Sequence, residues 1–233
     1  MSQPPSPTAR GEQAKAQLIA AGIELFSEKG AQTATTREIA RLAGQNIAAI
    51  FYYFGSKEGL YLAVAQWIAD FIQQANQPLM AEIDDLLAQH TPADPGQCRD
   101  YIIKSMMSFT ELLTNPKTVN LSKILSREQL MPTEAYQLIH HQAIAPLHQR
   151  FTKLVAGVTG CDPTDTTTIL HTHALLGEML SFRMARETIL LRTGWDDMGP
   201  EQITLIKTIL THHIDWILNG LRAEQAVVLG KTL

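Results

Sequence analysis

Hydrophobic residues recur at helical spacing along nearly the whole chain. In the first such segment they fall at i, i+1, i+4, i+7 and i+8, which is one face of a helix expected over residues 12–29. The residues of this face are Leu18, Ile19, Gly22, Leu25 and Phe26, and Gly30 follows as a stop. No stretch alternates between apolar and polar positions with hairpin turns on either side. The pattern therefore predicts an all-α fold.

Two short helices joined by a tight turn are expected next. Thr35 and Glu38 form a capping box at the start of a second helix over residues 36–43. Gly44 supplies the turn, because it has no Cβ, and a third helix follows over residues 46–53. This arrangement is the helix-turn-helix pattern, although many helical hairpins with the same spacing never meet DNA. A helix of this length fits the major groove, which is about 12 Å wide.

The rest of the chain continues in helices. Ser56 is the expected N-cap of a fourth helix, whose inner face carries Leu60, Val64, Trp67, Ile68 and Phe71. Further helices are expected over residues 79–90, 97–114, 116–130, 133–158, 163–191 and 200–222. Pro146 lies inside one of them and clashes with the carbonyl of Gln142, so a kink is expected there. Asp162 is expected to cap the helix that begins at Pro163.

Composition and charge narrow the class of protein. Hydrophobic residues make up 45% and charged residues 18% of the chain, which favours a packed globule over a disordered chain. The net charge is −4. Residues 1–60 hold six Lys or Arg and five Asp or Glu, a net of +1, so the remainder carries −5. A slightly basic segment on an acidic body is compatible with nucleic-acid contact at that segment alone.

Several other classes of protein are not expected. No apolar run approaches the roughly 18 residues of a membrane span, and the first residues lack the apolar core of a signal peptide. The two cysteines, Cys98 and Cys161, give neither a zinc spacing nor a disulfide framework. The eight histidines include no pair at i and i+4, and no nucleophile motif or glycine-rich phosphate loop occurs. We expect a soluble cytoplasmic protein without enzymatic activity, metal site or cofactor.

One segment, residues 18–62, resembles the N-terminal DNA-binding domain of the TetR family of bacterial transcriptional regulators. The resemblance rests on ELFSEKG, TTREIARLAG and IFYYFGSKEGLY. Later stretches, REQLMPTEAY, HQAIAPLH and HTHALLGEMLSFRMARE, resemble the CecR-like (YbiH-like) subgroup of that family. The resemblance implies an N-terminal helix-turn-helix DNA-binding domain, a C-terminal helical domain that binds an effector, and a homodimer. The expected organisation is an arm (1–10), a DNA-binding domain (11–57), an effector-binding and dimerisation domain (58–223) and a tail (224–233).

The resemblance also assigns residues to the DNA contact. They are Thr36, Arg37, Gln45, Asn46, Ala48, Ala49, Tyr52, Tyr53 and Lys57. An amide such as that of Asn46 can pair bidentately with adenine, and alanine methyls can touch thymine methyls. Tyrosine hydroxyls and a lysine can contact phosphate. The chain departs from many relatives in one respect, because residues 45–54 carry no charge and Ile47 stands where a lysine or another polar residue is common.

The resemblance further implies an effector cavity among the middle helices. Candidate lining residues are Met106, Phe109, Ile124 and Met131, although ordinary helix core explains the same residues. The expected dimer contact uses the last two long helices. Ala174, Gly177 and Ser181 are small and share one face, and Trp216 adds apolar surface.

The predicted function is a one-component, ligand-responsive transcriptional regulator, with repression as the expected mode. Its dimer would bind a palindromic operator in double-stranded DNA, and a small hydrophobic effector would release it. The alternative is an all-α protein-binding adaptor that has lost DNA binding. The uncharged third helix and the acidic total favour that alternative.

Overall fold

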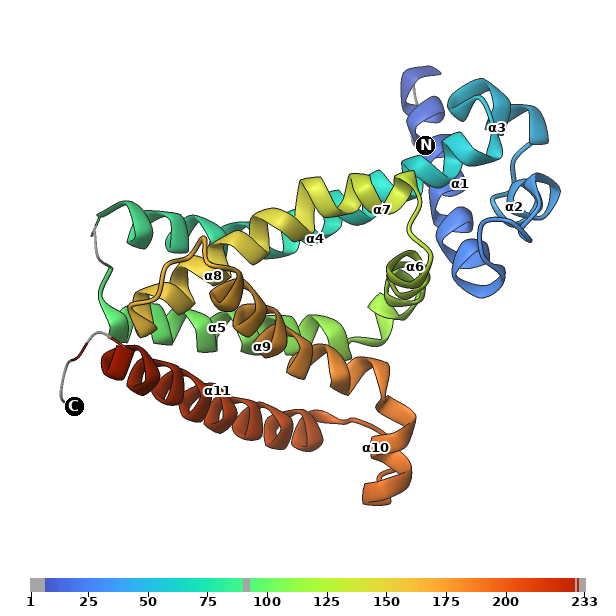
Figure 1. Ribbon diagram of the computed structural model, residues 1–233. Coiled ribbons are helices and arrows are strands. Elements are labelled where there is room, and N and C mark those ends of the chain that lie inside the picture. The colour runs from blue at the N-terminus through green and yellow to red at the C-terminus, as the bar shows by residue number, and fades with distance from the viewer. Residues whose placement is uncertain (1–6, 90–92, 229, 231–233) are drawn as a thin grey trace, which may run out of the picture. The chain divides into compact units, whose positions relative to one another are not determined.

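The computed structural model describes residues 7–89, 93–228 and 230, and the described residues form helices and no strand (Figure 1). This confirms the predicted all-α fold. The elements are α1 (Pro7–Lys29), α2 (Thr36–Leu42), α3 (Ile47–Phe54), α4 (Lys57–Gln89), α5 (Pro95–Thr114), the 3-10 turn η1 (Pro116–Thr118), α6 (Val119–Leu130), α7 (Glu134–Ile139), the π-helical turn η2 (His140–Ile144), α8 (Ala145–Thr159), α9 (Thr166–Met184), α10 (Arg186–Thr193) and α11 (Pro200–Val228). Residues 1–6 of the predicted arm and residues 229 and 231–233 of the predicted tail lie outside the described residues.

The chain divides into two compact units. The head unit comprises Met1–Ala75 with Val119–Ile144, and the body unit comprises Asn76–Thr118 with Ala145–Leu233. The head unit therefore contains α6 and α7 as well as the N-terminal helices. The sequence suggested a boundary after residue 57, between a DNA-binding domain and an effector-binding domain. That boundary divides the chain by function rather than by packing, and it stays a prediction.

The head unit is built on α1. Helices α2, α3 and α6 all pack against it, and α2 packs against α3. Its core also includes the first part of α4 and the inner faces of α6 and α7. The fully buried members of this core are Leu18, Ala34, Ile39, Ile50, Leu60, Val64, Ile68 and Ile139. One continuous apolar core thus fixes the two short helices.

The body unit is a group of helices that lie side by side (Figure 1). Helix α5 packs against α8, α9 and α11, and α8 packs against α9 and α11. Its most deeply buried residues include Ile83, Cys98, Ile102, Met106, Leu154, Leu210 and Ile214. Two of the ion pairs between its helices join an arginine to an aspartate through two hydrogen bonds each. Asp215 accepts 2.6 Å and 2.8 Å hydrogen bonds from Arg99, and Asp84 accepts 2.8 Å and 2.7 Å hydrogen bonds from Arg150.

The predicted kink near Pro146 takes the form of the π-helical turn η2. Proline has no N–H, so the carbonyl of Gln142, four residues earlier, loses its helical donor. Within the head unit, Gln73 Nε2 donates to that carbonyl at 2.5 Å. The side-chain amides of Gln66 and Gln142 also exchange two hydrogen bonds, of 2.6 Å and 3.0 Å. Side chains of α4 therefore replace the hydrogen bonding that the proline removes.

Two expected helix boundaries are wrong. The separate helix predicted from residue 79 is absent, because α4 runs through Pro78 without interruption. Pro78 and Gln74 are both exposed, so water can satisfy the carbonyl that lacks a donor. The helix predicted to start at Pro163 begins at Thr166 instead, because Asp165 is its N-cap.

The loop and the break around α9 have local causes. The carboxylate of Asp162 accepts 2.7 Å hydrogen bonds from the backbone and the hydroxyl of Thr164, which forms a turn in place of the expected cap. At its far end α9 stops at Met184, and α10 restarts after Ala185, whose φ is −103° and ψ 26°. The long helix expected over residues 163–191 is therefore two helices.

We predict that acid weakens the start of α2 through Glu38. Hydrogen bonds from Lys29 and from the side chain and backbone of Thr35 lower the pKa of Glu38 from 4.5 to about 2. A lowered carboxyl pKa stabilises the fold above about pH 4.5, and this contribution disappears as the pH falls toward 2. Glu38→Gln keeps an amide that can complete the capping box but removes the charge. Its thermal midpoint, followed by circular dichroism, should change less than that of the unmodified protein between pH 6 and pH 3.

Glu24→Gln is the matched control for this comparison, because Glu24 is an exposed glutamate of α1 outside the cluster. An identical acid dependence in the Glu38→Gln and unmodified proteins would contradict the assignment.

Candidate nucleic-acid interface

The turn between α2 and α3 is a compact backbone structure. The N–H of Ala43 donates to Ile39 at 2.9 Å, and the N–H of Gln45 donates to Ala40 at 2.9 Å. Gly44 between them has a φ of +63°, a conformation that favours glycine. The turn and the buried Ile50 together set the angle at which α3 leaves α2.

Helix α3 has a sharply divided surface. At about 3.6 residues per turn, the side chains of Ala48, Phe51 and Tyr52 fall within an arc of about 100°. All three are exposed, with 54% of Phe51 and 83% of Tyr52 accessible. Ile50 lies on the opposite side and is fully buried. We call Ala48, Phe51 and Tyr52 the reading face.

Sequence reasoning missed Phe51 as a member of this surface. Aromatic side chains are usually packed away, so Phe51 was not distinguished from core. Its position was nevertheless available from the helical spacing, because Phe51 lies three residues after Ala48 and one before Tyr52. A helical wheel centred on the buried Ile50 would have found it.

Asn46 is the N-cap of α3. Its backbone is extended, and its Oδ1 accepts a 3.0 Å hydrogen bond from the N–H of Ala48. The side-chain NH₂ is left as a donor. The bidentate adenine contact expected from the sequence needs both the oxygen and the nitrogen of this amide. While the cap is formed, one of the two lone pairs of Oδ1 is taken, and both N–H groups of the amide remain as donors to DNA.

Three predicted contact residues also hold the head together. Gln45 Nε2 donates at 2.8 Å to Gln17 of α1, which ties the turn to that helix. The ring of Tyr53 lies under Lys15, with 5.7 Å from Nζ to the ring centroid, and is half-buried. Ala49 packs partly against the core.

Lys57 has a structural task at the start of α4. Its Nζ donates to the carbonyls of Gln32 and Ala34 at 3.0 Å and 3.2 Å. These two bonds hold the loop between α1 and α2. One N–H of the ammonium group remains for a phosphate.

The cations available to DNA are few. Among the described cations of residues 7–57, Arg10, Arg37 and Arg41 are exposed and form no salt bridge. Lys15 pairs with Glu12 at 3.0 Å, and Lys29 is engaged with the capping box. Thr36 is half-buried at the first position of α2, directly before Arg37. Binding to the DNA phosphates would therefore depend mainly on these arginines and on uncharged hydrogen-bond donors.

The four predicted effector-pocket residues do not gather in one unit. Met106 and Phe109 lie in the core of the body unit, where the Phe109 ring is 5.8 Å from that of Phe151. Ile124 belongs to the core of the head unit. Met131 lies just after α6 and is 76% exposed. They therefore do not line a single cavity inside either unit.

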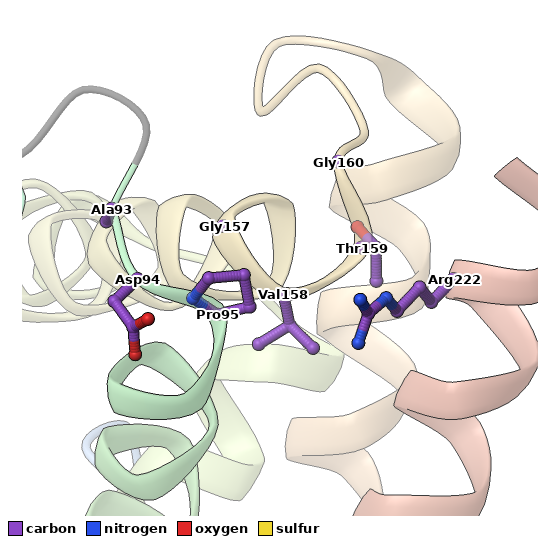
Figure 2. Close-up of a pocket in the computed structure, with 8 residues that line it drawn as sticks. All are labelled: Ala93, Asp94, Pro95, Gly157, Val158, Thr159, Gly160 and Arg222. Carbon is purple, nitrogen blue, oxygen red and sulfur yellow. The ribbon is translucent and has the colours of Figure 1, made fainter. Parts of the chain in front are cut away.

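The body unit has a shallow hollow of about 510 Å³ (Figure 2). It lies between the start of α5, the end of α8 and α11, and its lining residues are Ala93, Asp94, Pro95, Gly157, Val158, Thr159, Gly160 and Arg222. Figure 2 shows Arg222 reaching from α11 toward Val158 and Thr159. None of the predicted pocket residues lines it. Cys98 lies close to Gly157, since a Cβ added to Gly157 would be 2.6 Å from the Sγ of Cys98.

The outer sides of α9 and α11 expose large apolar residues. They are Ile169, Leu170, Leu180, Met184, Leu205, Ile209 and Trp216. The predicted dimer residues lie on the same helices: Ala174 and Ser181 are exposed, Gly177 is half-buried, and Trp216 is 68% exposed. A Cβ added to Gly177 would meet nothing within 4 Å. This surface lies entirely on the body unit, and a partner chain could bind to it.

No described helix has the length and apolar character that crossing a membrane requires. The described His, Cys, Asp and Glu residues form no group of three or more that could hold a metal ion.

Comparison with known proteins gives the family. Residues 18–64 match the family described as "Bacterial regulatory proteins, tetR family". Residues 100–221 match the family described as "HTH-type transcriptional dual regulator CecR, C-terminal domain". The HTH-type transcriptional dual regulator CecR of Shigella flexneri is 57% identical to this chain over 217 residues, which are 93% of this chain and 96% of that protein.

Solved structures agree on the fold. AibR, crystallised with isovaleryl coenzyme A and operator DNA, is 14% identical with a TM-score of 0.61, over 85% of this chain and 96% of its own. A putative transcriptional regulator from Pseudomonas aeruginosa PAO1 is 18% identical with a TM-score of 0.61, over 91% and 94%. The match to CecR covers nearly the whole chain and joins the helix-turn-helix to a CecR-type body. The chain therefore belongs to the TetR family of transcriptional regulators, in its CecR-like group.

Proposed function

We propose that this regulator is a cytoplasmic repressor, which binds a palindromic operator as a homodimer and is released by a small hydrophobic effector. The observation that carries the DNA part of the proposal is the reading face. Ala48, Phe51 and Tyr52 project from a short helix that is fixed by a buried core and a glycine turn. A helix presented in this way fits the major groove, where base edges are read.

The dimer contact is assigned to α9 and α11. Their outer sides expose apolar side chains, and such patches on soluble proteins mark interaction sites. Small residues at Ala174, Gly177 and Ser181 let a second helix approach closely. A twofold contact uses the same patch on both subunits, which would present two heads to a twofold operator.

The effector pocket is assigned to the body unit, around Met106 and Phe109. Ile124 and Met131 belong to the head unit and are not placed in this pocket. Methionine and phenylalanine are adaptable and apolar, which suits a hydrophobic effector. The same fold in AibR was crystallised with isovaleryl coenzyme A and operator DNA together. An effector would act by binding the form with wrongly spaced heads more tightly than the DNA-binding form.

The head unit supplies a route for the signal. Arg127 of α6 donates to the carbonyl of Phe26 at 2.6 Å and to that of Glu28 at 3.0 Å, at the end of α1. The next residue, Glu128, is buried and accepts a 2.7 Å hydrogen bond from Tyr61 of α4. Burial and this bond raise the pKa of Tyr61, so its hydroxyl stays a donor at neutral pH. A displacement of α6 would thus be passed to α1 and α4.

A second candidate mode is activation at some operators. The 57% identical protein of Shigella flexneri is named a transcriptional dual regulator. The same DNA-binding dimer could serve both modes, because the effect on transcription depends on where the operator lies relative to the promoter.

The proposal predicts salt-dependent binding to one specific sequence. The duplex selected by the full-length protein from a random pool should be palindromic, and log K should fall by about 0.9 per phosphate neutralised for each unit of log salt. Arg37→Ala should reduce the slope by about two per dimer if Arg37 meets phosphate in each head. Fluorescence anisotropy at several salt concentrations measures the slope. Failure to select any sequence would reject the regulator and favour the adaptor.

A second prediction separates the two roles of Asn46. Asn46→Ser keeps an oxygen that can cap α3, whereas Asn46→Ala removes both the cap and the amide. The alanine variant should lose about 1 kcal/mol of unfolding free energy, and the serine variant much less. Both should change the preferred base at one symmetric pair of operator positions and leave the salt slope nearly unchanged, because the amide is neutral. If Asn46→Ser retains the original base preference, Asn46 does not read bases.

A third prediction concerns Gly177. A larger side chain has open space within the subunit, so Gly177→Arg should fold normally. Against a close-packed partner helix it should turn the dimer into a monomer, and operator affinity should fall by tenfold or more. Light scattering at micromolar concentration measures the assembly. Ala88→Arg adds the same charge to an exposed position of α4 and should leave the dimer intact; a dimeric Gly177→Arg protein would exclude this contact.

A further inference from the structure

The reading face has an unusual chemical character for a DNA contact. Its three side chains, Ala48, Phe51 and Tyr52, are exposed and uncharged, and two of them are aromatic rings. Nothing in α3 can form a charged or bidentate hydrogen bond with a base, since the helix consists of Ile, Ala, Phe and Tyr residues alone. Apart from the hydroxyl of Tyr52, the contacts that this face can offer a base are therefore apolar.

The polar group beside this face is a donor. Asn46 stands at the start of α3, and the hydrogen bond from the N–H of Ala48 occupies its Oδ1. The same bond fixes which end of the amide is oxygen and which is nitrogen. The amide of the neighbouring Gln45 is engaged with Gln17 of α1. The surface that meets the groove thus presents an N–H donor next to a methyl group and an exposed ring.

We propose that this surface selects thymine, so that A·T pairs with their thymines facing Phe51 and Ala48 form the centre of each half-site. In the major groove thymine presents an O4 acceptor and a C5 methyl group side by side. Asn46 Nδ2 would donate to O4, and Phe51 with Ala48 would cover the methyl. The inference rests on the proposed function, because it concerns the sequence that the DNA-binding head prefers.

The other three bases fit this surface less well. Cytosine presents an N4 donor and no methyl group, and would oppose the Asn46 donor. Adenine would need the Asn46 oxygen to accept a second hydrogen bond while it caps α3, whereas thymine needs only the side-chain NH₂. Guanine is usually read by the paired donors of Arg or Lys, and α3 carries neither. Thymine is the base for which apolar cover adds affinity.

Deoxyuridine gives a direct test, because it differs from thymidine only by the C5 methyl group. The operator is first selected from a random duplex pool with the full-length protein. Duplexes are then made in which deoxyuridine replaces thymidine at one symmetric pair of positions at a time. Fluorescence anisotropy gives the dissociation constant of each duplex for the unmodified protein, Phe51→Ser, Phe51→Leu and the control Leu130→Ser. Leu130 is 82% exposed on α6, outside the reading face.

The expected result is a loss at particular thymines. Removing one buried methyl lowers affinity about fourfold, so substitution in both half-sites should cost the unmodified protein about tenfold or more. Leu130→Ser should show the same loss, and Phe51→Leu should keep most of it. Phe51→Ser should bind the thymidine and deoxyuridine duplexes within about twofold of each other, because the methyl would then have lost the ring and kept only the contact with Ala48.

Two results would overturn the inference while leaving the regulator intact. One is a selected operator whose affinity is unchanged by deoxyuridine at every position. The other is a deoxyuridine loss of equal size in the Phe51→Ser and unmodified proteins, which would place the methyl against another residue. Selection of no sequence at all would instead reject the proposed function. Thermal unfolding of Phe51→Ser checks that it folds, and Phe51→Leu remains informative if it does not.

Discussion

The helices that would meet DNA depend on a core that they cannot provide themselves. Helices α2 and α3 have 7 and 8 residues, and isolated helices shorter than about 12 residues are marginal in water. Their stability comes from burying Ile39 and Ile50 beside Leu18 of α1 and Leu60 of α4. Because this core fixes α3 from the inside, the outer side chains add little to the fold. Residues of the reading face are thus free to serve recognition.

The second constraint is that backbone carbonyls left open at helix ends and loops need donors. Arg127 serves the end of α1, Lys57 serves the loop before α2, and Gln73 serves the carbonyl that Pro146 deprives of its donor. Each of these side chains connects segments far apart in the sequence. The same bonds that complete the head unit therefore join α1, α4, α6 and the π-helical turn, which is why a change in α6 has a route to the DNA-binding helices.

The candidate site could be located from the sequence, but the tasks of its residues could not all be assigned. The capping box of Thr35 and Glu38 and the turn at Gly44 are local features, and both occur as expected. That Lys57 also binds two loop carbonyls could not be foreseen, because nothing in its neighbourhood along the chain shows that they would lie within reach of its ammonium group. For the same reason Gln45 could not be matched with Gln17, 28 residues away.

The sequence by itself determined the all-helical fold and the position of the DNA-binding head, because helical period, caps and glycine turns act over a few residues. It also located the distortion at Pro146, since a missing N–H is a property of the residue. Tertiary structure decided what these elements pack against. It placed α6 and α7 in the head unit, left Met131 exposed, and carried α4 through Pro78 as one helix. Burial and hydrogen bonding between distant segments depend on the three-dimensional packing, and a pattern read along one helix does not contain it.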